Sequence, residues 1–147
     1  MIVLVAGSSG LAGSAIALAF ENQGHKVIRV NRNVVDLLDL DATRNLVLDT
    51  KPDLIVDAAA RVGGIGANNS FPVEFLVENI RMQTNLMESA HATKVKKFVF
   101  LGSSCIYPRE CSQPIKEEYL LTGPLESTNS AYAIAKITGI ELVKSYR

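Results

Sequence analysis

The chain has 147 residues, which is enough for one domain with a packed core. Its 15 basic and 15 acidic residues cancel, so the composition argues against nucleic acid or an anionic membrane surface as a partner. The two cysteines make no disulfide framework, and glycines interrupt the apolar N-terminal stretch, so we expect neither a signal peptide nor a membrane span but a cytoplasmic protein.

The N-terminal segment has the order of elements that a dinucleotide-binding fingerprint requires. The pattern predicts a buried strand (2–6), a glycine-rich turn (7–13), a helix (14–23) and a second strand (25–30). In this turn Gly7 bends the chain, Gly10 lets the backbone approach a pyrophosphate, and Gly13 lets the helix pack close to the strand. The amides at the helix start would then face the phosphates.

The end of the second predicted strand distinguishes NAD from NADP. An acidic residue there binds the ribose hydroxyls, whereas a nearby arginine accommodates a 2′-phosphate. Here the strand ends in Asn31-Arg32-Asn33 and carries no acidic residue. We therefore predict NADP(H) as the cofactor, with Arg32 as the partner of the phosphate; a solvated basic turn is the alternative.

The middle of the chain continues the alternation of helices and strands. The pattern predicts a short helix (42–50), a buried strand (53–60), a polar loop (61–72), a long helix (72–92) and a further strand (98–101). Asp39 or Asp41 is placed to cap the first of these helices. The polar loop follows a parallel strand and so lies at the carboxyl edge of the sheet, where open α/β sheets bind ligands.

Residues that can transfer protons follow the last predicted strand. Ser103 and Cys105 come directly after it, and Tyr132 and Lys136 lie one turn apart on a later helix. A lysine ammonium near a phenol favours the phenolate, so we expect Lys136 to lower the pKa of Tyr132 from its usual value of about 10. With a serine hydroxyl to hold a carbonyl oxygen, this set suits proton transfer to or from a sugar or alcohol oxygen. A lone cysteine at a strand end, such as Cys105, is by itself more often an inert buried thiol.

The order of elements predicts an α/β fold with a Rossmann-like, doubly wound parallel sheet and right-handed crossovers. No repeat or linker divides the chain, so residues 1–147 form one NAD(P)-binding domain, incomplete at its C-terminal end. The long proline-rich segment at 107–130 lies between the serine and tyrosine residues, where it could cover a substrate.

Four strings in the chain carry a resemblance to a known family. They are GSSGLAG (7–13), AAARVGGIGANN (58–69), LGSSCIYP (101–108) and ESTNSAYAIAKITG (126–139). On these strings the chain resembles the extended short-chain dehydrogenase/reductases of the NAD-dependent epimerase/dehydratase family, and among them the GDP-L-fucose synthases. The resemblance covers the whole chain but only the N-terminal half of a typical member, so the small C-terminal substrate domain is expected to be missing.

The resemblance implies a reaction and roles for individual residues. Members reduce and epimerise GDP-4-keto-6-deoxy-D-mannose to GDP-L-fucose with NADPH, and the complete enzyme is expected to be a homodimer. Ser103 would polarise the C4 carbonyl, Tyr132 would protonate its oxygen, and Lys136 would orient the nicotinamide ribose. Cys105 would be the acid/base of epimerisation, whose histidine partner has no counterpart here. The cofactor contacts would be Gly7, Ser8, Ser9, Gly10, Leu11, Arg32, Asp39 (at the adenine), Ala58, Ala60, Leu101, Tyr132 and Lys136. The substrate contacts would be Val62, Gly63, Gly64 and Ser104, and no metal ligand is expected.

Alternatives remain open at this point. The chain could belong to another nucleotide-sugar epimerase, dehydratase or reductase of the same family, although Cys105 favours the synthase. It could also be a non-catalytic dinucleotide-binding module, against which the joint presence of Ser103, Tyr132 and Lys136 argues. Ser9 stands where some synthases carry a basic residue, which leaves more of the 2′-phosphate selectivity to Arg32. By itself the chain is expected to hold dinucleotide weakly and not to turn over nucleotide-sugar.

Overall fold

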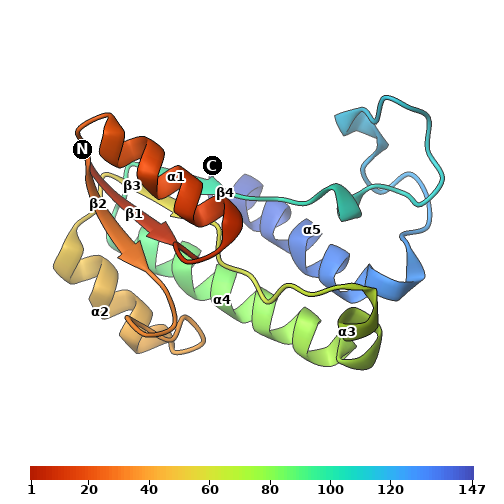
Figure 1. Ribbon diagram of the computed structural model, residues 1–147, viewed down its shortest axis with the longest axis horizontal. Helices are drawn as coiled ribbons and strands as arrows, with labels where there is room; N and C mark the ends of the chain where they lie inside the picture. The colour runs from red at the N-terminus through yellow and green to blue at the C-terminus, as the bar shows by residue number, and fades with distance from the viewer.

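Four short strands form one parallel sheet in the computed structural model, which describes residues 1–147 (Figure 1). The strands are β1 (Ile2–Ala6), β2 (Lys26–Val30), β3 (Leu54–Asp57) and β4 (Lys97–Phe100). Their order across the sheet is β2-β1-β3-β4, and each neighbouring pair is parallel. The strand order reverses direction between β1 and β3, which makes this the topological switch point of the sheet.

Helices cover both faces of the sheet (Figure 1). They are α1 (Leu11–Asn22), α2 (Leu40–Thr50), α3 (Ile65–Ser70), α4 (Pro72–Ala92) and α5 (Ser130–Ser145). Three short 3-10 turns are η1 (Ser104–Ile106), η2 (Glu117–Tyr119) and η3 (Ser127–Asn129). Helix α1 packs on one face, α2 and α4 pack on the other, and α5 lies beside α4. The predicted Rossmann-like α/β fold is therefore confirmed.

The alternation of side chains along β1 produces a core on both sides of the sheet. Leu4 and Ala6 pack in the cluster that α2 and α4 complete, whereas Val3 and Val5 pack against Ala17 of α1. All five side chains are fully buried. A strand that is apolar on both faces is typical of the interior of a parallel α/β sheet.

A buried amide and a glycine hold α5 against α4 and β4. The side-chain amide of Gln83 in α4 donates to the carbonyl of Ala135 in α5 at 2.8 Å. Gly139 lies so close to Phe100 that a Cβ would overlap the aromatic ring. This close approach brings the neighbouring turn of α5, with Lys136, to the carboxyl end of β4.

Several predicted elements differ from the structure. The strand predicted at 53–60 ends at Asp57, and the helix predicted to begin at 42 begins at Leu40. Helix α1 begins at Leu11 rather than at Ser14, because Gly10 already serves as its N-cap. Helix α3 lies inside the stretch predicted as loop, where the Asn68 side chain donates to the carbonyl of Gly63 at 2.9 Å. Glycine disfavours helix and this segment has little apolar periodicity, so tertiary context decides its conformation.

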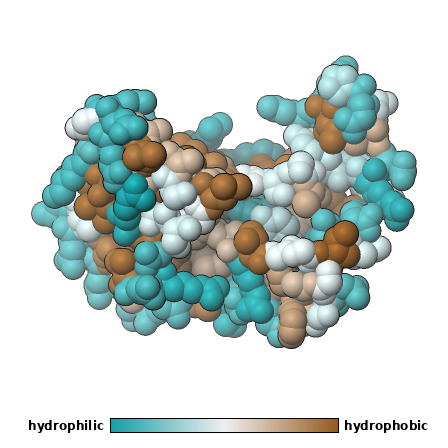
Figure 2. Space-filling model, viewed as in Figure 1, coloured by the Kyte–Doolittle hydropathy of each residue, from teal (hydrophilic) through white to brown (hydrophobic).

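Figure 2 shows a hollow between the body of the sheet and the lobe formed by the segment that follows β4. Apolar surface borders parts of this hollow, and hydrophilic surface dominates the outline of the molecule in this view. No helix of the structure is long and apolar enough to span a membrane. The hollow lies on the side of the sheet edge where the strands end, which is where the predicted site residues gather.

Candidate active site

A cavity of about 780 Å³ opens at the carboxyl ends of β1 and β3, at the topological switch point. This volume is typical of a ligand pocket, for which about 300–1,000 Å³ is usual. The lining comes from the glycine loop, from the connections that follow β2, β3 and β4, and from α4 and α5. Of the predicted site residues, the lining contains Gly7, Ser9, Gly10, Leu11, Arg32, Ala58, Ala60, Val62, Leu101, Tyr132 and Lys136.

The backbone of the glycine loop forms a floor that fits an anionic group. Gly7 has a φ of +75°, and a Cβ on it would lie 2.5 Å from the carbonyl oxygen of Ala58. Gly13 packs so close on Gly7 that a Cβ there would overlap the backbone. Gly10 caps α1 without a side chain, so the helix N-terminus stays open toward the cavity. Its amides and the positive end of its dipole suit a pyrophosphate.

The three side chains after Gly7 point in different directions. Ser8 is buried, and its hydroxyl donates to the carbonyl of Val30 at 3.0 Å. Its side chain therefore ties the loop to β2 and does not line the cavity, which differs from the predicted cofactor contact. Ser9 and Leu11 do line the cavity, and the Leu11 side chain is 94% exposed and open to a ligand.

Two arginines near the end of β2 have different surroundings. Arg29 is paired with Glu21 through two hydrogen bonds of 2.8 Å, and this partner raises the pKa of Arg29. Arg32 lines the cavity and makes no ion pair or side-chain hydrogen bond. Arg32 is therefore the cation that is available to an anionic group at this end of the cavity.

The carboxylate at this end of the cavity is Asp36 rather than Asp39. The Asp39 side chain accepts a hydrogen bond from the Ala42 amide at 3.0 Å, which is the N-cap of α2. It does not line the cavity, so the structure favours capping over the predicted contact with adenine. Asp36 does line it, and Asp36 also accepts a bond from the Leu38 amide at 3.0 Å.

A buried carboxylate that the sequence analysis missed lies at the end of β3. Asp57 is 1% exposed, one of its oxygens accepts a bond from the Ala59 amide at 3.1 Å, and the other oxygen has no partner. Burial raises its pKa to about 6, against the opposing effects of Lys136 and of the Ala59 amide. In the sequence Asp57 directly precedes three alanines, and this local pattern does not indicate that its carboxylate is buried.

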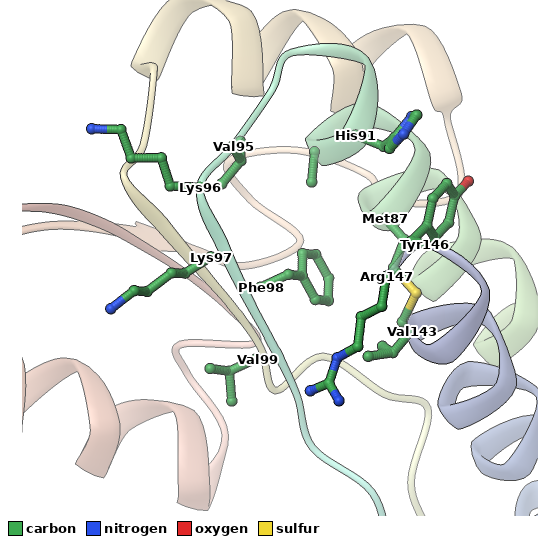
Figure 3. Close-up of a pocket in the computed structure, with 11 residues that line it drawn as sticks. Met87, His91, Val95, Lys96, Lys97, Phe98, Val99, Val143, Tyr146 and Arg147 are labelled. Atoms are coloured by element: carbon green, nitrogen blue, oxygen red, sulfur yellow. The ribbon is translucent and has the colours of Figure 1, made fainter.

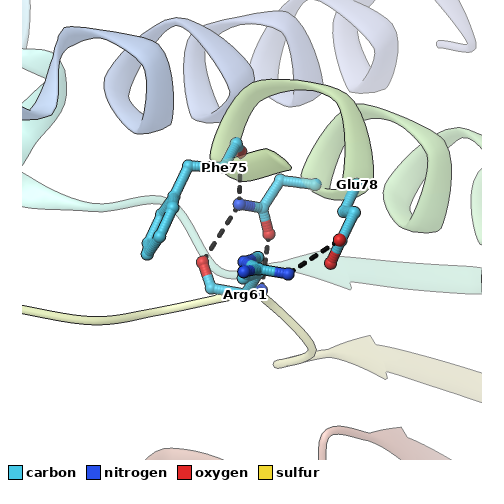
Figure 4. Close-up of polar contacts among 4 residues, drawn as sticks. Arg61, Phe75 and Glu78 are labelled. Carbon is cyan, nitrogen blue, oxygen red and sulfur yellow. Dashed lines mark hydrogen bonds and ion pairs between the residues drawn. The ribbon is translucent and has the colours of Figure 1, made fainter. Parts of the chain in front are cut away.

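The segment after β3 is braced by Asn79 of α4 (Figure 4). The buried Asn79 amide donates to the carbonyls of Arg61 and Phe75 at 3.0 and 2.6 Å, and its oxygen accepts from the Arg61 amide at 2.7 Å. The Arg61 guanidinium pairs with Glu78 at 2.7 Å and lies over the Phe75 ring. Arg61 and Glu78 line the cavity, so this network sets the shape of one wall.

The predicted substrate residues lie at the outer part of this wall and after β4. Val62 lines the cavity and is 70% exposed. Gly63 and Gly64 are exposed before α3 and do not line the cavity. Ser104 is exposed at the start of η1.

Ser103 and Cys105 occupy a tight turn directly after β4. The Ser103 hydroxyl accepts a hydrogen bond from the Cys105 amide at 3.3 Å and caps η1. The Cys105 sulfur accepts a hydrogen bond from the side-chain amide of Asn129 at 3.3 Å. Neither residue lines the cavity itself, but both neighbour Tyr132, which does. No group of side chains in the structure could hold a metal ion.

The predicted effect of Lys136 on Tyr132 is wrong. Burial raises the pKa of the Tyr132 phenol, a hydrogen bond with Ser103 opposes the rise, and Cys105 adds to it. Lys136 is not among the groups that shift this pKa. At neutral pH the phenol is therefore protonated and can act as an acid.

Lys136 is directed to the end of β4 instead of to the phenol. It is only 3% exposed, and its ammonium donates to the Leu101 carbonyl at 2.9 Å and lies 4.6 Å from the centre of the Phe100 ring. Burial lowers the pKa of Lys136, and Asp57 opposes that change. Strand register and helix packing, rather than helical spacing, determine where this side chain points.

A second cavity, of about 430 Å³, lies between β4 and the C-terminal ends of α4 and α5 (Figure 3). Phe98 points into it, the rings of His91 and Tyr146 stack beside it, and Lys96 and Lys97 flank it. This cavity is at the amino end of β4, whereas ligands of open α/β sheets bind at the carboxyl ends. None of the predicted site residues lines it.

Comparisons with known proteins agree with this geometry. The family described as "NAD dependent epimerase/dehydratase family" matches residues 3–147. The chain is 46% identical to the GDP-L-fucose synthase of Sinorhizobium fredii, over 99% of this chain and 46% of the relative. It is 44% identical to the GDP-L-fucose synthase of Escherichia coli, over 98% of this chain and 45% of the relative.

Two solved structures with bound NADP are similar over 99% of this chain. One is MlghC, a GDP-mannoheptose C4 reductase from Campylobacter jejuni, with a TM-score of 0.93, 32% identity and 46% of its chain covered. The other is a GDP-L-fucose synthetase from Naegleria fowleri, with a TM-score of 0.88, 31% identity and 44% of its chain covered. The chain thus spans less than half the length of these relatives. It belongs to the NAD dependent epimerase/dehydratase family, and its sequence is GDP-L-fucose synthase-like.

Proposed function

We propose that this chain is the NADP(H)-binding part of an enzyme that epimerises and reduces GDP-4-keto-6-deoxy-D-mannose to GDP-L-fucose. The observation that carries the proposal is a single cavity that joins the glycine loop and Arg32 to Tyr132 and Lys136. An anion site and a proton donor in one cavity are what a dinucleotide-dependent reductase needs. The names of the relatives support a GDP-sugar as the substrate.

The residues of the cavity fit a phosphorylated dinucleotide. The amides at the start of α1 would hold the pyrophosphate, and Arg32 would hold a 2′-phosphate. Ala58 and Ala60 would let the group lie against the end of β3. When bound, the cofactor would supply the hydride that reduces the ketone.

Three side chains would handle the carbonyl oxygen. The Tyr132 phenol, whose raised pKa keeps it protonated at neutral pH, gives its proton to the oxygen as the alcohol forms. The Ser103 hydroxyl, which is close to that phenol, holds the oxygen in place. The buried Lys136 ammonium sets a positive charge behind them, at the end of β4.

Cys105 would carry out the proton transfers of epimerisation. Protons on the carbons that flank a ketone are acidic because the carbonyl oxygen accepts the negative charge. A thiolate can remove such a proton from one face of the sugar ring, and a proton delivered to the opposite face completes the inversion. The tight turn of η1 holds Cys105 beside Ser103, so both act near one carbonyl group.

A binding and product assay tests the proposal. We expect the chain to bind NADPH weakly, and Gly10→Val to abolish that binding because a side chain would fill the approach to the pyrophosphate. With NADPH and the keto-sugar we expect no sustained formation of GDP-L-fucose by the 147 residues alone. Equal NADPH binding by the parent chain and Gly10→Val, or no binding by either, would count against the cofactor site. Sustained turnover of the keto-sugar would show that these residues suffice for catalysis.

The second candidate is a reductase that does not epimerise. The similarity to MlghC, which is named as a C4 reductase, favours it. The two candidates differ in the exchange of the protons that flank the ketone. If the keto-sugar takes up deuterium from D₂O at these carbons with the parent protein but not with Cys105→Ser, epimerisation is favoured. If a protein that binds the sugar causes no such uptake, the reductase is favoured.

A further inference from the structure

Asn129 has an unexpected partner for its position. It is the N-cap residue of α5, where asparagine is among the residues whose side chains most often accept a bond from the first amides of the helix. The Asn129 side chain makes no such bond. Its amide instead donates to the sulfur of Cys105 at 3.3 Å.

The contact is not explained by stability alone. The side-chain oxygen of Asn129 is buried and has no hydrogen-bond partner. A buried acceptor without a partner is unfavourable, and so is the loss of a helix cap. Asn129 thus gives up the cap bond that this same oxygen could accept, in the position that brings its N–H group to the sulfur.

Cys105 lies at the N-terminal end of helix α5. Its sulfur lies beside the N-cap residue of the 16-residue helix α5, whose dipole is positive at this end. The other titratable group that faces it is the Tyr132 phenol of α5. In the loop before η3, Arg109 and Glu126 pair with each other at 3.4 Å, and α3, which packs against η3, has no charged residue.

We propose that Asn129 is a positioning residue for Cys105, whose N–H group fixes the sulfur and stabilises its negative charge. The proposal rests on the proposed role of Cys105 as the acid/base of epimerisation. In that step the C–H bond beside the ketone breaks, an S–H bond forms, and the electron pair moves to the carbonyl oxygen. An N–H group binds an anionic acceptor more strongly than a neutral one, so Asn129 holds the thiolate ready before the transfer.

The geometry also links the site to the long loop. Cys105 precedes the loop and Asn129 ends it, 24 residues later. The contact therefore closes the loop at its base and joins η1 to the start of α5. A shift of η3 would move the N–H donor away from the sulfur.

The rate of alkylation of Cys105 by iodoacetamide, measured across pH, tests the proposal without cofactor or sugar. All proteins carry Cys111→Ser, so that one thiol reacts. The test variants are Asn129→Ser and Asn129→Asp, because Ser and Asp cap helices well while neither can donate an amide N–H to the sulfur. Asn69→Ser, at an exposed position of α3, is the matched control.

We expect Asn129→Ser to slow alkylation at pH 7 by about tenfold, since the thiolate is the reacting form and loses a hydrogen bond. Asn129→Asp should slow it further, because a carboxylate repels the thiolate. In strong alkali the variants should regain the parent rate, and thermal unfolding should show no loss of stability. An unchanged rate at pH 7, or a loss that is equal at every pH, would overturn the proposal. Failure of NADPH binding would instead count against the proposed function alone.

Discussion

The glycine loop and the segment from Ser103 to Tyr132 lie at the same edge of the sheet, but they are held in different ways. The loop is fixed by backbone packing, in which Gly7 and Gly13 leave no room for a Cβ. In the other segment the side-chain oxygen of Asn129 lacks a hydrogen-bond partner, and so does one oxygen of Asp57 at the end of the neighbouring strand β3. Steric fit thus determines the first region, and electrostatics and hydrogen bonding determine the second.

This difference has a consequence for substitutions. A change at Gly7 or Gly13 should act mainly on the free energy of unfolding, because a Cβ at either position overlaps neighbouring backbone. A change near the ends of β3 and β4 should act mainly on pH dependence and on ligand affinity. Substitutions in each region test this difference.

The largest effect is expected from Gly13→Ala. A Cβ there overlaps the Gly7 backbone, so α1 must move away from β1, at a cost of about 3 kcal/mol or more in the free energy of unfolding. Urea denaturation measures this cost. Gly66→Ala is the control, because a Cβ at Gly66 in α3 meets no atom and alanine favours helix. Equal stability of the two variants would show that the loop is not held by packing.

A smaller effect, visible as pH dependence, is expected from Asp57→Asn. The pKa of Asp57 is about 6 in the folded chain against an ordinary value of 3.8, so the folded state keeps a proton that the unfolded state releases. The stabilisation from this group is full below pH 4 and is lost as the pH rises through 6, by about 3 kcal/mol. Asp57→Asn should remove that part of the pH dependence of the free energy of unfolding.

Asp53→Asn provides a control of opposite sign. The Ile2 amide donates to Asp53 at 2.9 Å and lowers its pKa, so Asp53 stabilises the fold at neutral pH and loses this effect as the pH falls. The contribution of each aspartate to the free energy of unfolding, taken as parent minus variant, should therefore fall with rising pH for Asp57 and rise with rising pH for Asp53. Slopes of the same sign would contradict the assigned burial of Asp57.

The features that could be predicted from the sequence are those that depend on residues close together in the chain. The strand, glycine turn and helix at the N-terminus, and the placement of Tyr132 and Lys136 on one helix, follow from local periodicity and are present in the structure. The same local reasoning predicted the wrong partner for Lys136, whose ammonium bonds to Leu101, 35 residues away. Only the packing of α5 on β4 determines that contact.

The missed features share this dependence on tertiary contacts. The side chain of Ser8 turns to Val30 of β2, and Asp57 is buried at the end of β3, where the charge of Lys136 from α5 reaches it. Asn129 is the N-cap residue of α5, and the cysteine whose sulfur it contacts lies 24 residues earlier in the chain. Periodicity and motif spacing carry no information on such pairs.

The central claim is that the cavity of this chain binds a dinucleotide and prefers NADP(H) through Arg32. The most direct measurement is the dissociation constants of NADPH and NADH for the parent chain, Arg32→Gln and Arg29→Gln. We predict that the parent prefers NADPH by about tenfold, as one charge-assisted contact allows, and that Arg32→Gln loses this preference. Arg29→Gln should keep it, because Arg29 is already paired with Glu21. A parent chain that binds neither nucleotide, or binds both equally, would contradict the account.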